Sequence, residues 1–286
     1  MTPLRLGYFG PAGTFTHAAL LASGHTGASD EVVPFATERE TILAAESGAV
    51  DAALVPIENS LEGGVNATLD TLVFGAEGVH IVGEEVLPVS HALIARSGIG
   101  MADLTAVTSH PQALAQCRRF LAEQLPGRTA IAATSTAEAV RAVASGSDPH
   151  AAIGTTTAAE IYGCAVLAEG IEDEHGNETR FLWVAASGTT PFAAVEPGRA
   201  FKTSIVFHGA GDASPGWLVR CLSELAFRGI NLTRIESRPL RRQLGHYLFL
   251  ADLEGSIEDA QVAEAVDRLH VHCEVVRVLG SFPVAA

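Results

Sequence analysis

Basic residues are scarce in this sequence. Its 286 residues include 18 Lys and Arg against 33 Asp and Glu, a formal net charge of −15. A nucleic-acid partner requires a basic surface that neutralises phosphates, so this charge balance argues against nucleic acid. An anionic small molecule stays compatible with it, because the field inside a pocket differs from that of the whole chain.

Cysteine is also rare, and long apolar runs are absent. The cysteines form no C-x-x-C pair: they are Cys117, Cys164, Cys221 and Cys273. This spacing predicts buried thiols in a reducing cytosol and no metal site. His270 and His272 would share a strand face, but a third ligand is missing. No run of 18 apolar residues and no secretory leader pattern occurs, so we expect a cytoplasmic protein without a membrane partner.

The abundant residues are small and apolar. Hydrophobic residues make up 48% of the chain, charged residues 18%, and there are 28 glycines, which is typical of an α/β protein. The length suits two domains. Apolar strands alternate with helical patterns through the first 190 residues, and Pro88 interrupts a long apolar segment. We therefore expect two lobes around a hinged cleft, like periplasmic-type binding folds, with lobe 1 at about 1–85 and 165–187 and lobe 2 at about 86–164.

Two polar loops follow predicted strands in the first lobe. One is Gly10-Pro11-Ala12-Gly13-Thr14, whose glycines let the backbone approach a ligand and whose Thr14 caps the next helix. The glycine spacing does not match a dinucleotide fingerprint. The other loop is Glu58-Asn59-Ser60, at a strand end where ligands collect in α/β sheets. Ordinary turn chemistry uses the same residue types, so a purely structural role stays open for both loops.

Two further polar segments complete the set. In Ser109-His110-Pro111-Gln112, the serine caps a helix start, which favours anions, and Gln112 and Gln116 share one helix face. In Thr179-Arg180-Phe181, a hydroxyl stands beside a guanidinium at a strand start. Such a pair can donate to a leaving oxygen and hold a carboxylate. The alternative is a strand start with a solvated arginine.

Taken together, these segments resemble the prephenate dehydratase family. The matching strings are Gly10-Pro11-Ala12-Gly13-Thr14-Phe15, Pro56-Ile57-Glu58-Asn59-Ser60, Ser109-His110-Pro111-Gln112-Ala113-Leu114 and Asn177-Glu178-Thr179-Arg180-Phe181. They occur in the family's order and span most of residues 1–187, the expected catalytic domain. The resemblance implies conversion of prephenate to phenylpyruvate in L-phenylalanine biosynthesis, a lyase reaction that needs no cofactor. Its catalytic threonine falls on Thr179.

The resemblance and the loops together nominate the site residues. We expect Thr179, Glu58 and Asn59 to be catalytic, with Thr179 donating a hydrogen bond or a proton to the leaving hydroxyl. Arg180 would bind substrate charge, and Phe181 would hold the strand in the core. The expected substrate-binding residues are Gly13, Thr14, Ser60, Ser109, Gln112, Gln116, Arg180 and Phe181.

The last part of the chain follows a different pattern. Residues 188–200 are rich in small and turn-forming types and indicate a linker. Residues 201–286 show the order βαββαβ of a ferredoxin-like domain. The strings Pro215-Gly216, Asn231-Leu232 and Glu236-Ser237-Arg238-Pro239 resemble the ACT domains that regulate such enzymes. One departure is Trp217, where the family usually has alanine; the indole would narrow the pocket, change the effector or lie on the surface.

The ACT resemblance implies feedback inhibition by L-phenylalanine, bound where two subunits meet, and hence a homodimer or homotetramer. The expected effector-binding residues are Pro215, Gly216, Trp217, Leu218, Asn231, Leu232, Glu236, Ser237, Arg238 and Pro239. Two other functions stay open. One is a sensor that binds an amino acid or keto acid without chemistry, and the other is an arogenate dehydratase, which acts on the aminated substrate.

Overall fold

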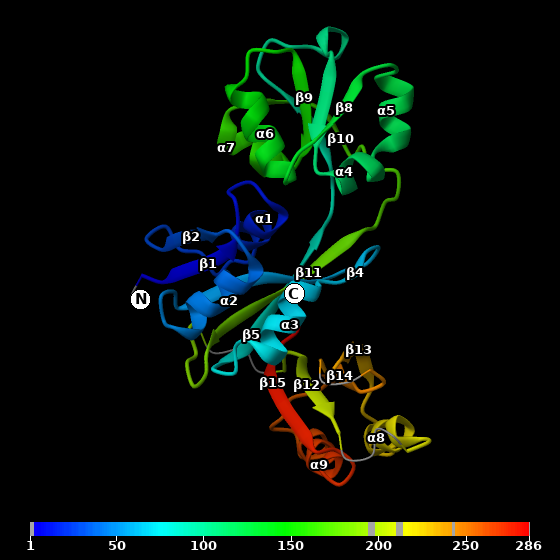
Figure 1. The fold of residues 1–286 in the computed structure, drawn as a ribbon. Coiled ribbons are helices and arrows are strands. Elements are labelled where there is room, and N and C mark those ends of the chain that lie inside the picture. Colours follow the sequence, from blue (N-terminus) through cyan, green and yellow to red (C-terminus); the bar gives the residue numbers. More distant parts are fainter. Residues whose placement is uncertain (1–2, 194–197, 210–213, 242–243, 286) are drawn as a thin grey trace.

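The computed structural model describes residues 3–193, 198–209, 214–241 and 244–285. In it the chain forms two α/β lobes and a C-terminal domain, with lobe 1 lying between the other two bodies (Figure 1). This arrangement confirms the predicted fold class, a two-lobed binding fold followed by a βαββαβ domain. No helix in the described part of the chain is long and apolar enough to span a membrane.

Lobe 1 is built on a mixed sheet with strand order β2-β1-β3-β11-β5, and β4 pairs with the end of β3. The first three strands are parallel, whereas β11 runs antiparallel to both of its neighbours. The elements are β1 (Arg5–Phe9), α1 (Phe15–Ala22), β2 (Glu31–Phe35), α2 (Glu38–Glu46), β3 (Ala52–Asn59), β4 (Gly63–Gly64), α3 (Asn66–Phe74), β5 (Val79–Pro88) and β11 (Glu178–Ala186).

Strand β11 is the centre of lobe 1, because apolar side chains cover both of its faces. Phe181 and Trp183 pack against α1 and β1 on one face, and Leu182 and Val184 join a second cluster on the other. Alternation along a strand sends successive side chains to opposite faces. Every residue of β11 therefore belongs either to the α1 face or to the opposite face.

Lobe 2 holds a second mixed sheet, with strand order β10-β6-β9-β7-β8. Its elements are β6 (Ala92–Ala95), η1 (Met101–Asp103), β7 (Ala106–Ser109), α4 (Pro111–Gln116), α5 (Arg118–Gln124), β8 (Thr129–Ala132), α6 (Thr136–Ser145), β9 (His150–Gly154), α7 (Thr156–Tyr162) and β10 (Ala165–Glu169). The chain returns to lobe 1 later than the expected residue 165, because β10 pairs antiparallel with β6 and so belongs to lobe 2.

The C-terminal domain is a four-stranded antiparallel sheet, ordered β13-β14-β12-β15. Its elements are β12 (Phe201–His208), α8 (Trp217–Ala226), β13 (Leu232–Pro239), β14 (Tyr247–Glu254), α9 (Ala260–Leu269) and β15 (Val275–Pro283). Side chains of both helices pack on one face of this sheet. The predicted linker, 188–200, lies partly outside the described residues.

The other face of the C-terminal sheet packs directly on lobe 1. Val206, Leu250 and Phe282 belong to the same buried cluster as Ile81 and Leu182 of lobe 1. At Gly280 the backbones approach so closely that a Cβ atom would lie 2.3 Å from the carbonyl oxygen of Ile81. The C-terminal domain is thus joined to the sheet that contains β11 by a continuous apolar core.

Candidate active site

A cavity of about 330 Å³ lies between the two lobes, a size that suits a small-molecule ligand. Its described lining contains no Lys, Arg, Asp or Glu side chain. The lining residues are Phe9, Thr14, Phe15, Thr16, Pro56, Asn59, Val89, His91, His110, Gln112, Ala113, Gln116, Thr134, Ser135, Thr136, Asn177, Thr179 and Phe181. Within the described residues, no three His, Cys, Asp or Glu side chains gather as metal ligands would.

The lobe 1 wall presents a hydroxyl whose hydrogen bonding is fixed. Thr179 and Asn59 are paired across β11 and β3, and Asn59 Nδ2 donates to Thr179 Oγ1 at 2.9 Å. The other end of the amide is oriented by backbone, since Asn59 Oδ1 accepts from the N–H groups of Leu61 and Glu62. Because Thr179 Oγ1 accepts from Asn59, its own proton is free to be donated to a ligand in the cavity.

The lobe 2 wall presents two amides and a buried imidazole. Gln112 and Gln116 lie on the short helix α4, and Gln116 Oε1 is 2.9 Å from His91 Nε2. His91 is only 2% exposed, and its ring lies nearly perpendicular to that of Phe15. Burial lowers the pKa of His91, although the hydrogen bond with Gln116 partly opposes this shift. A neutral His91 therefore holds Gln116 in place at the cavity.

Two helices begin at the cavity wall. Thr14 caps α1 by accepting from the backbone N–H of His17, and Ser135 caps α6 by accepting from that of Glu138. The first turn of a helix carries backbone N–H groups without intrahelical partners and a partial positive charge. Anionic groups are thereby favoured in a cavity whose described lining has no Lys or Arg side chain.

The loop at residues 10–14 also forms hydrogen bonds between the two lobes. Thr155 Oγ1 donates to Gly13 O at 2.8 Å, and Tyr162 donates to Ala12 O at 2.9 Å. Gly13 has φ +87°, and a Cβ atom there would lie 2.9 Å from that of Ala158. Gly13 is therefore required by the contact between lobes, and it does not line the cavity as a substrate-binding residue would.

Two of the expected substrate-binding serines are structural in this geometry. Ser109 is fully buried, and its hydroxyl donates to Ile153 O inside lobe 2. Ser60 donates to Asn177 Oδ1 and accepts from the N–H of Glu178. Ser60 thus ties the start of β11 to β3, next to Thr179, without lining the cavity.

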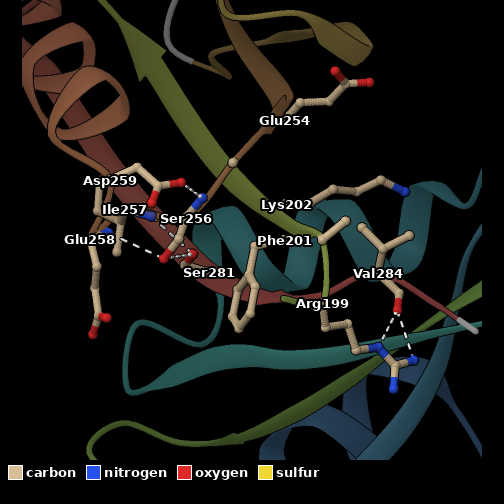
Figure 2. A pocket seen from close by; sticks show the side chains of 12 residues that line it. Arg199, Phe201, Lys202, Glu254, Ser256, Ile257, Glu258, Asp259, Ser281 and Val284 are labelled. Carbon is tan, nitrogen blue, oxygen red and sulfur yellow. Dashed lines mark hydrogen bonds between the residues drawn. The ribbon is translucent and has the colours of Figure 1, made fainter. Parts of the chain in front are cut away.

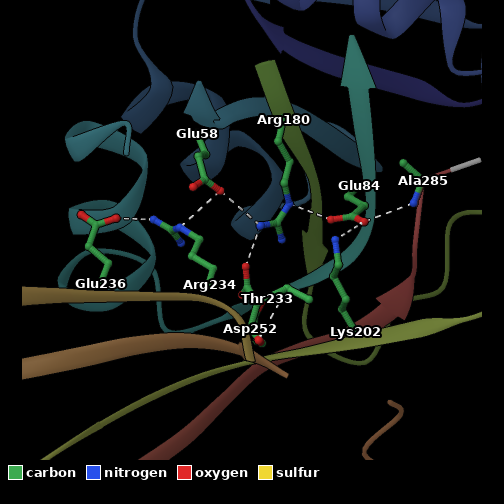
Figure 3. Close-up of polar contacts among 10 residues, drawn as sticks. Glu58, Glu84, Arg180, Lys202, Thr233, Arg234, Glu236, Asp252 and Ala285 are labelled. Carbon is green, nitrogen blue, oxygen red and sulfur yellow. Dashed lines mark hydrogen bonds and ion pairs between the residues drawn. The ribbon is translucent and has the colours of Figure 1, made fainter. Parts of the chain in front are cut away.

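The positions of Glu58 and Arg180 differ from our expectation. Each precedes or follows a cavity residue on its strand, so each side chain points to the opposite face (Figure 3). Arg180 pairs there with Glu84 and with Asp252 of the C-terminal domain. This position argues against the predicted contacts of Arg180 with a substrate carboxylate and of Glu58 with the reacting group.

Other residues that line the cavity were not predicted from the sequence. His91 and Asn177 stand in the two segments that cross between the lobes, and Thr134 and Thr136 flank the cap of α6. A serine before an alanine-rich helical segment, as at Ser135, is a capping pattern, but nothing local shows that this helix start faces the cleft. The one detectable signal for His91 was its position three residues after Pro88, where the sequence predicts a crossing between lobes.

In the C-terminal domain, the expected effector residues are divided between two places. Gly216, Trp217 and Leu218 line a hollow of about 300 Å³ at the start of α8. Glu236 and Arg238 lie on β13 and form ion pairs with Arg234 and with Asp70 of lobe 1. Pro215 precedes α8, whereas Asn231, Leu232, Ser237 and Pro239 lie at or on β13.

The alternative that placed Trp217 on the surface is wrong. The indole is buried against Phe207 and Phe249, which stack on each other, and its N–H donates to His272 O. A second, larger hollow of about 910 Å³ lies beside β12, β15 and the start of α9 (Figure 2). Some of its polar groups bond to one another, such as Asp259 with the N–H of Ser256, and others bond outside it, such as Lys202 with Glu84. It contains none of the expected site residues.

We expect replacement of His91 by Asn to raise KM for the ligand of this cavity by about fivefold, because Gln116 loses the partner that holds its amide, a hydrogen bond worth about 1 kcal/mol. The matched control is His270→Asn, which changes an exposed histidine outside the cavity and should leave KM unchanged. Steady-state kinetics on both variants check this. An unchanged KM for His91→Asn would contradict the assigned role.

The chain is similar to known proteins over nearly its whole length. Residues 6–189 match the family model described as prephenate dehydratase. A prephenate dehydratase of Mycobacteroides abscessus is 44% identical over 284 residues, covering 98% of this chain and 90% of the relative. The structure of prephenate dehydratase from Arthrobacter aurescens in complex with L-Phe has a TM-score of 0.86 and 37% identity, covering 98% of this chain and 90% of that chain.

A further solved structure, described as GqqA, a novel type of quorum quenching acylase, also has a TM-score of 0.86, with 30% identity and 98% coverage of both chains. The family match spans both lobes, and the relatives span almost the whole chain. The strands and loops that form the cavity, including the one that carries Thr179, lie within the matched residues. The chain belongs to the prephenate dehydratase family.

Proposed function

We propose that this chain converts prephenate to phenylpyruvate in L-phenylalanine biosynthesis and that the reaction takes place in the cavity between the lobes. The observation that carries the proposal is the hydrogen bond from Asn59 to Thr179, which leaves the hydroxyl proton of Thr179 free for a ligand. A pure sensor has no need of such a donor. The membership in the prephenate dehydratase family supports the same reaction.

The chemistry needs a hydrogen-bond donor more than a strong acid. The bond between the ring and its carboxylate breaks, carbon dioxide leaves, and the electron pair enters the ring. The C–O bond to the ring hydroxyl breaks in concert, and hydroxide leaves as the ring becomes aromatic. A donor aimed at that oxygen stabilises the developing negative charge, an effect worth about 10²- to 10³-fold in rate. Thr179 supplies this donor, and Asn59 orients it.

The two substrate carboxylates are bound by neutral donors. We assign them to the first turns of α1 and α6, with the amides of Gln112 and Gln116 fixing their orientation. The absence of Lys and Arg side chains from the described lining supports this assignment. Phe181 forms an apolar part of the wall, where the ring of the substrate would lie.

The C-terminal domain is proposed to bind L-phenylalanine and inhibit the reaction. The relative from Arthrobacter aurescens is described in complex with L-Phe, and the effector residues here are divided between α8 and β13. Strand β13 is the outer strand of its sheet, with Ile235 half exposed. A second copy would complete the effector site, so we propose a homodimer or homotetramer that works in the cytoplasm.

The test is to incubate the purified protein with prephenate and, separately, with arogenate, with and without L-phenylalanine. We expect phenylpyruvate from prephenate at a higher kcat/KM than phenylalanine from arogenate, and we expect added L-phenylalanine to slow the reaction. Consumption of arogenate alone would identify the wrong substrate. Binding of prephenate without turnover would support a sensor and contradict the proposed catalysis.

A further inference from the structure

The strands that carry the proposed donor have a second face, directed at the C-terminal domain. On β11, Thr179 lines the cavity and the next residue, Arg180, lies on the other side. On β3, Asn59 lines the cavity and the preceding residue, Glu58, lies on the other side. On each strand, therefore, a residue that lines the cavity is the direct neighbour of a residue that faces the C-terminal domain.

Arg180 is held on that second face by a buried ion cluster (Figure 3). Its side chain is 11% exposed, with Nη1 2.6 Å from Asp252 Oδ2 and Nε 2.7 Å from Glu84 Oε2. Both carboxylate residues are only 4% exposed. Removing one partner of such a pair leaves an uncompensated buried charge, so the position of the guanidinium is strongly constrained.

The cluster spans the boundary between lobe 1 and the C-terminal domain. Asp252 lies on β14 and accepts a hydrogen bond from Ser204 of β12, which fixes its carboxylate. Glu84 lies on β5 and accepts from Lys202 of β12 at 2.8 Å. Arg180 is thus bound both to lobe 1 and to the C-terminal domain. The position of its guanidinium depends on where the C-terminal domain places Asp252.

A similar ion-pair contact connects the C-terminal domain to β3 through Glu58. Glu58 Oε2 lies 3.6 Å from Arg180 Nη1 and 3.5 Å from Nε of Arg234 on β13, and Arg234 pairs with Glu236. The pairing of β3 with β11 is irregular here, because the register shifts between Arg180 and Phe181. A register shift disrupts the hydrogen-bond ladder locally, so contacts on the reverse face add to what holds the two strands together.

We propose that Arg180 is a positioning residue, which sets the place of Thr179 through its ion pair with Asp252 and so makes turnover depend on the C-terminal domain. The inference rests on the proposed function of Thr179. Arg180 touches no substrate. The pair instead holds β11 where the Thr179 hydroxyl meets both Asn59 and the cavity. Since Glu236 belongs to the expected effector motif, the same contacts provide a physical link from that motif to the strands of the site.

The test compares two variants of the pair, Arg180→Lys and Asp252→Asn, with two controls. The control Lys202→Gln perturbs the same cluster without removing a partner of Arg180, and Asp70→Asn breaks the ion pair between domains at Arg238. We expect kcat on prephenate to fall about tenfold or more in both pair variants, with KM within about twofold. We expect both controls to keep kcat within about twofold.

Coupling is measured with the double variant. If Arg180 acts through Asp252, the two substitutions are not independent, and the double variant loses no more activity than the more impaired single variant. Losses that multiply would contradict the proposal. Ser204→Ala, which keeps every charge and removes only the hydrogen bond to Asp252, is the milder alternative if Asp252→Asn does not fold; we expect a loss of about threefold.

A second readout does not depend on turnover. In the wild-type protein the side-chain NH₂ of Asn59 donates to Thr179, so its NMR resonances report this contact. We expect them to shift in Arg180→Lys and Asp252→Asn and to stay in place in Lys202→Gln and Asp70→Asn. Wild-type protein that makes no phenylpyruvate would contradict the proposed function. Unshifted Asn59 resonances in folded pair variants would overturn the positioning role.

Discussion

Replacement of Thr179 by Ala is expected to lower kcat on prephenate by about 10²- to 10³-fold, the usual cost of removing a donor aimed at developing negative charge. KM should change little, because the proposed contact strengthens as the hydroxide leaves and contributes less to the bound substrate. The Ala side chain keeps the strand conformation and removes only the hydroxyl and a methyl group. Steady-state kinetics on folded, purified protein measure the effect.

The control for this prediction is Thr179→Ser, which keeps a hydroxyl within reach of Asn59. We expect it to retain kcat within about tenfold of the wild-type value, the loss reflecting the less restricted rotamer of serine. A Thr179→Ala protein with near-full turnover would show that the hydroxyl is not used. Equal losses in both variants would point to a steric role for the threonine methyl group.

Replacement of Phe181 by Ala is expected to lower the free energy of unfolding by about 3–5 kcal/mol, the range for truncating a large buried aromatic residue. Phe181 is 1% exposed and packs in one cluster with Trp183 and residues of β1 and α1. The surrounding sheet cannot collapse into the space, because β11 is paired on both sides. Urea unfolding followed by circular dichroism measures the loss.

Phe181→Leu is the matched control, since it keeps most of the apolar volume. We expect it to cost less than half as much stability as the Ala variant, and to raise KM if the ring forms part of the substrate wall. A loss of stability below about 1 kcal/mol for Phe181→Ala would contradict the packing described for β11.

Much of the fold could be predicted from the sequence, because its signals are local. Apolar strands followed directly by capped helices indicated the α/β lobes, and the βαββαβ order indicated the C-terminal domain. The boundary of lobe 2 was placed too early, since nothing in residues 165–169 shows that this strand pairs with β6. Strand partners are set by long-range packing, which a local pattern does not contain.

The candidate site was predicted only in part, because local patterns do not contain long-range packing. Loops carrying Asn59, Gln112 and Thr179 do meet at one cavity. Arg180 was assigned to the cavity although the period of two along a strand already places it opposite Thr179. What the sequence does not show is the carboxylate that Arg180 meets there, because Asp252 lies 72 residues away in another domain.

The burial of Trp217 is a further case of long-range packing. The residue belongs to the expected effector motif, and the sequence did not show whether its side chain is buried or on the surface. In the structure its indole N–H donates to the carbonyl oxygen of His272, after α9, and its ring packs against Phe207 and Phe249. Only the assembled domain brings these residues together.

The central claim is that prephenate reacts in the cavity between the lobes, with its ring hydroxyl at Thr179. The most direct measurement is a crystal structure of the Thr179→Ala variant with prephenate, since this variant should bind the substrate and turn it over slowly. We predict prephenate between the lobes, with the ring hydroxyl facing residue 179 and Asn59 and the carboxylates toward the starts of α1 and α6. Prephenate bound elsewhere, or bound with a carboxylate at residue 179, would contradict the account.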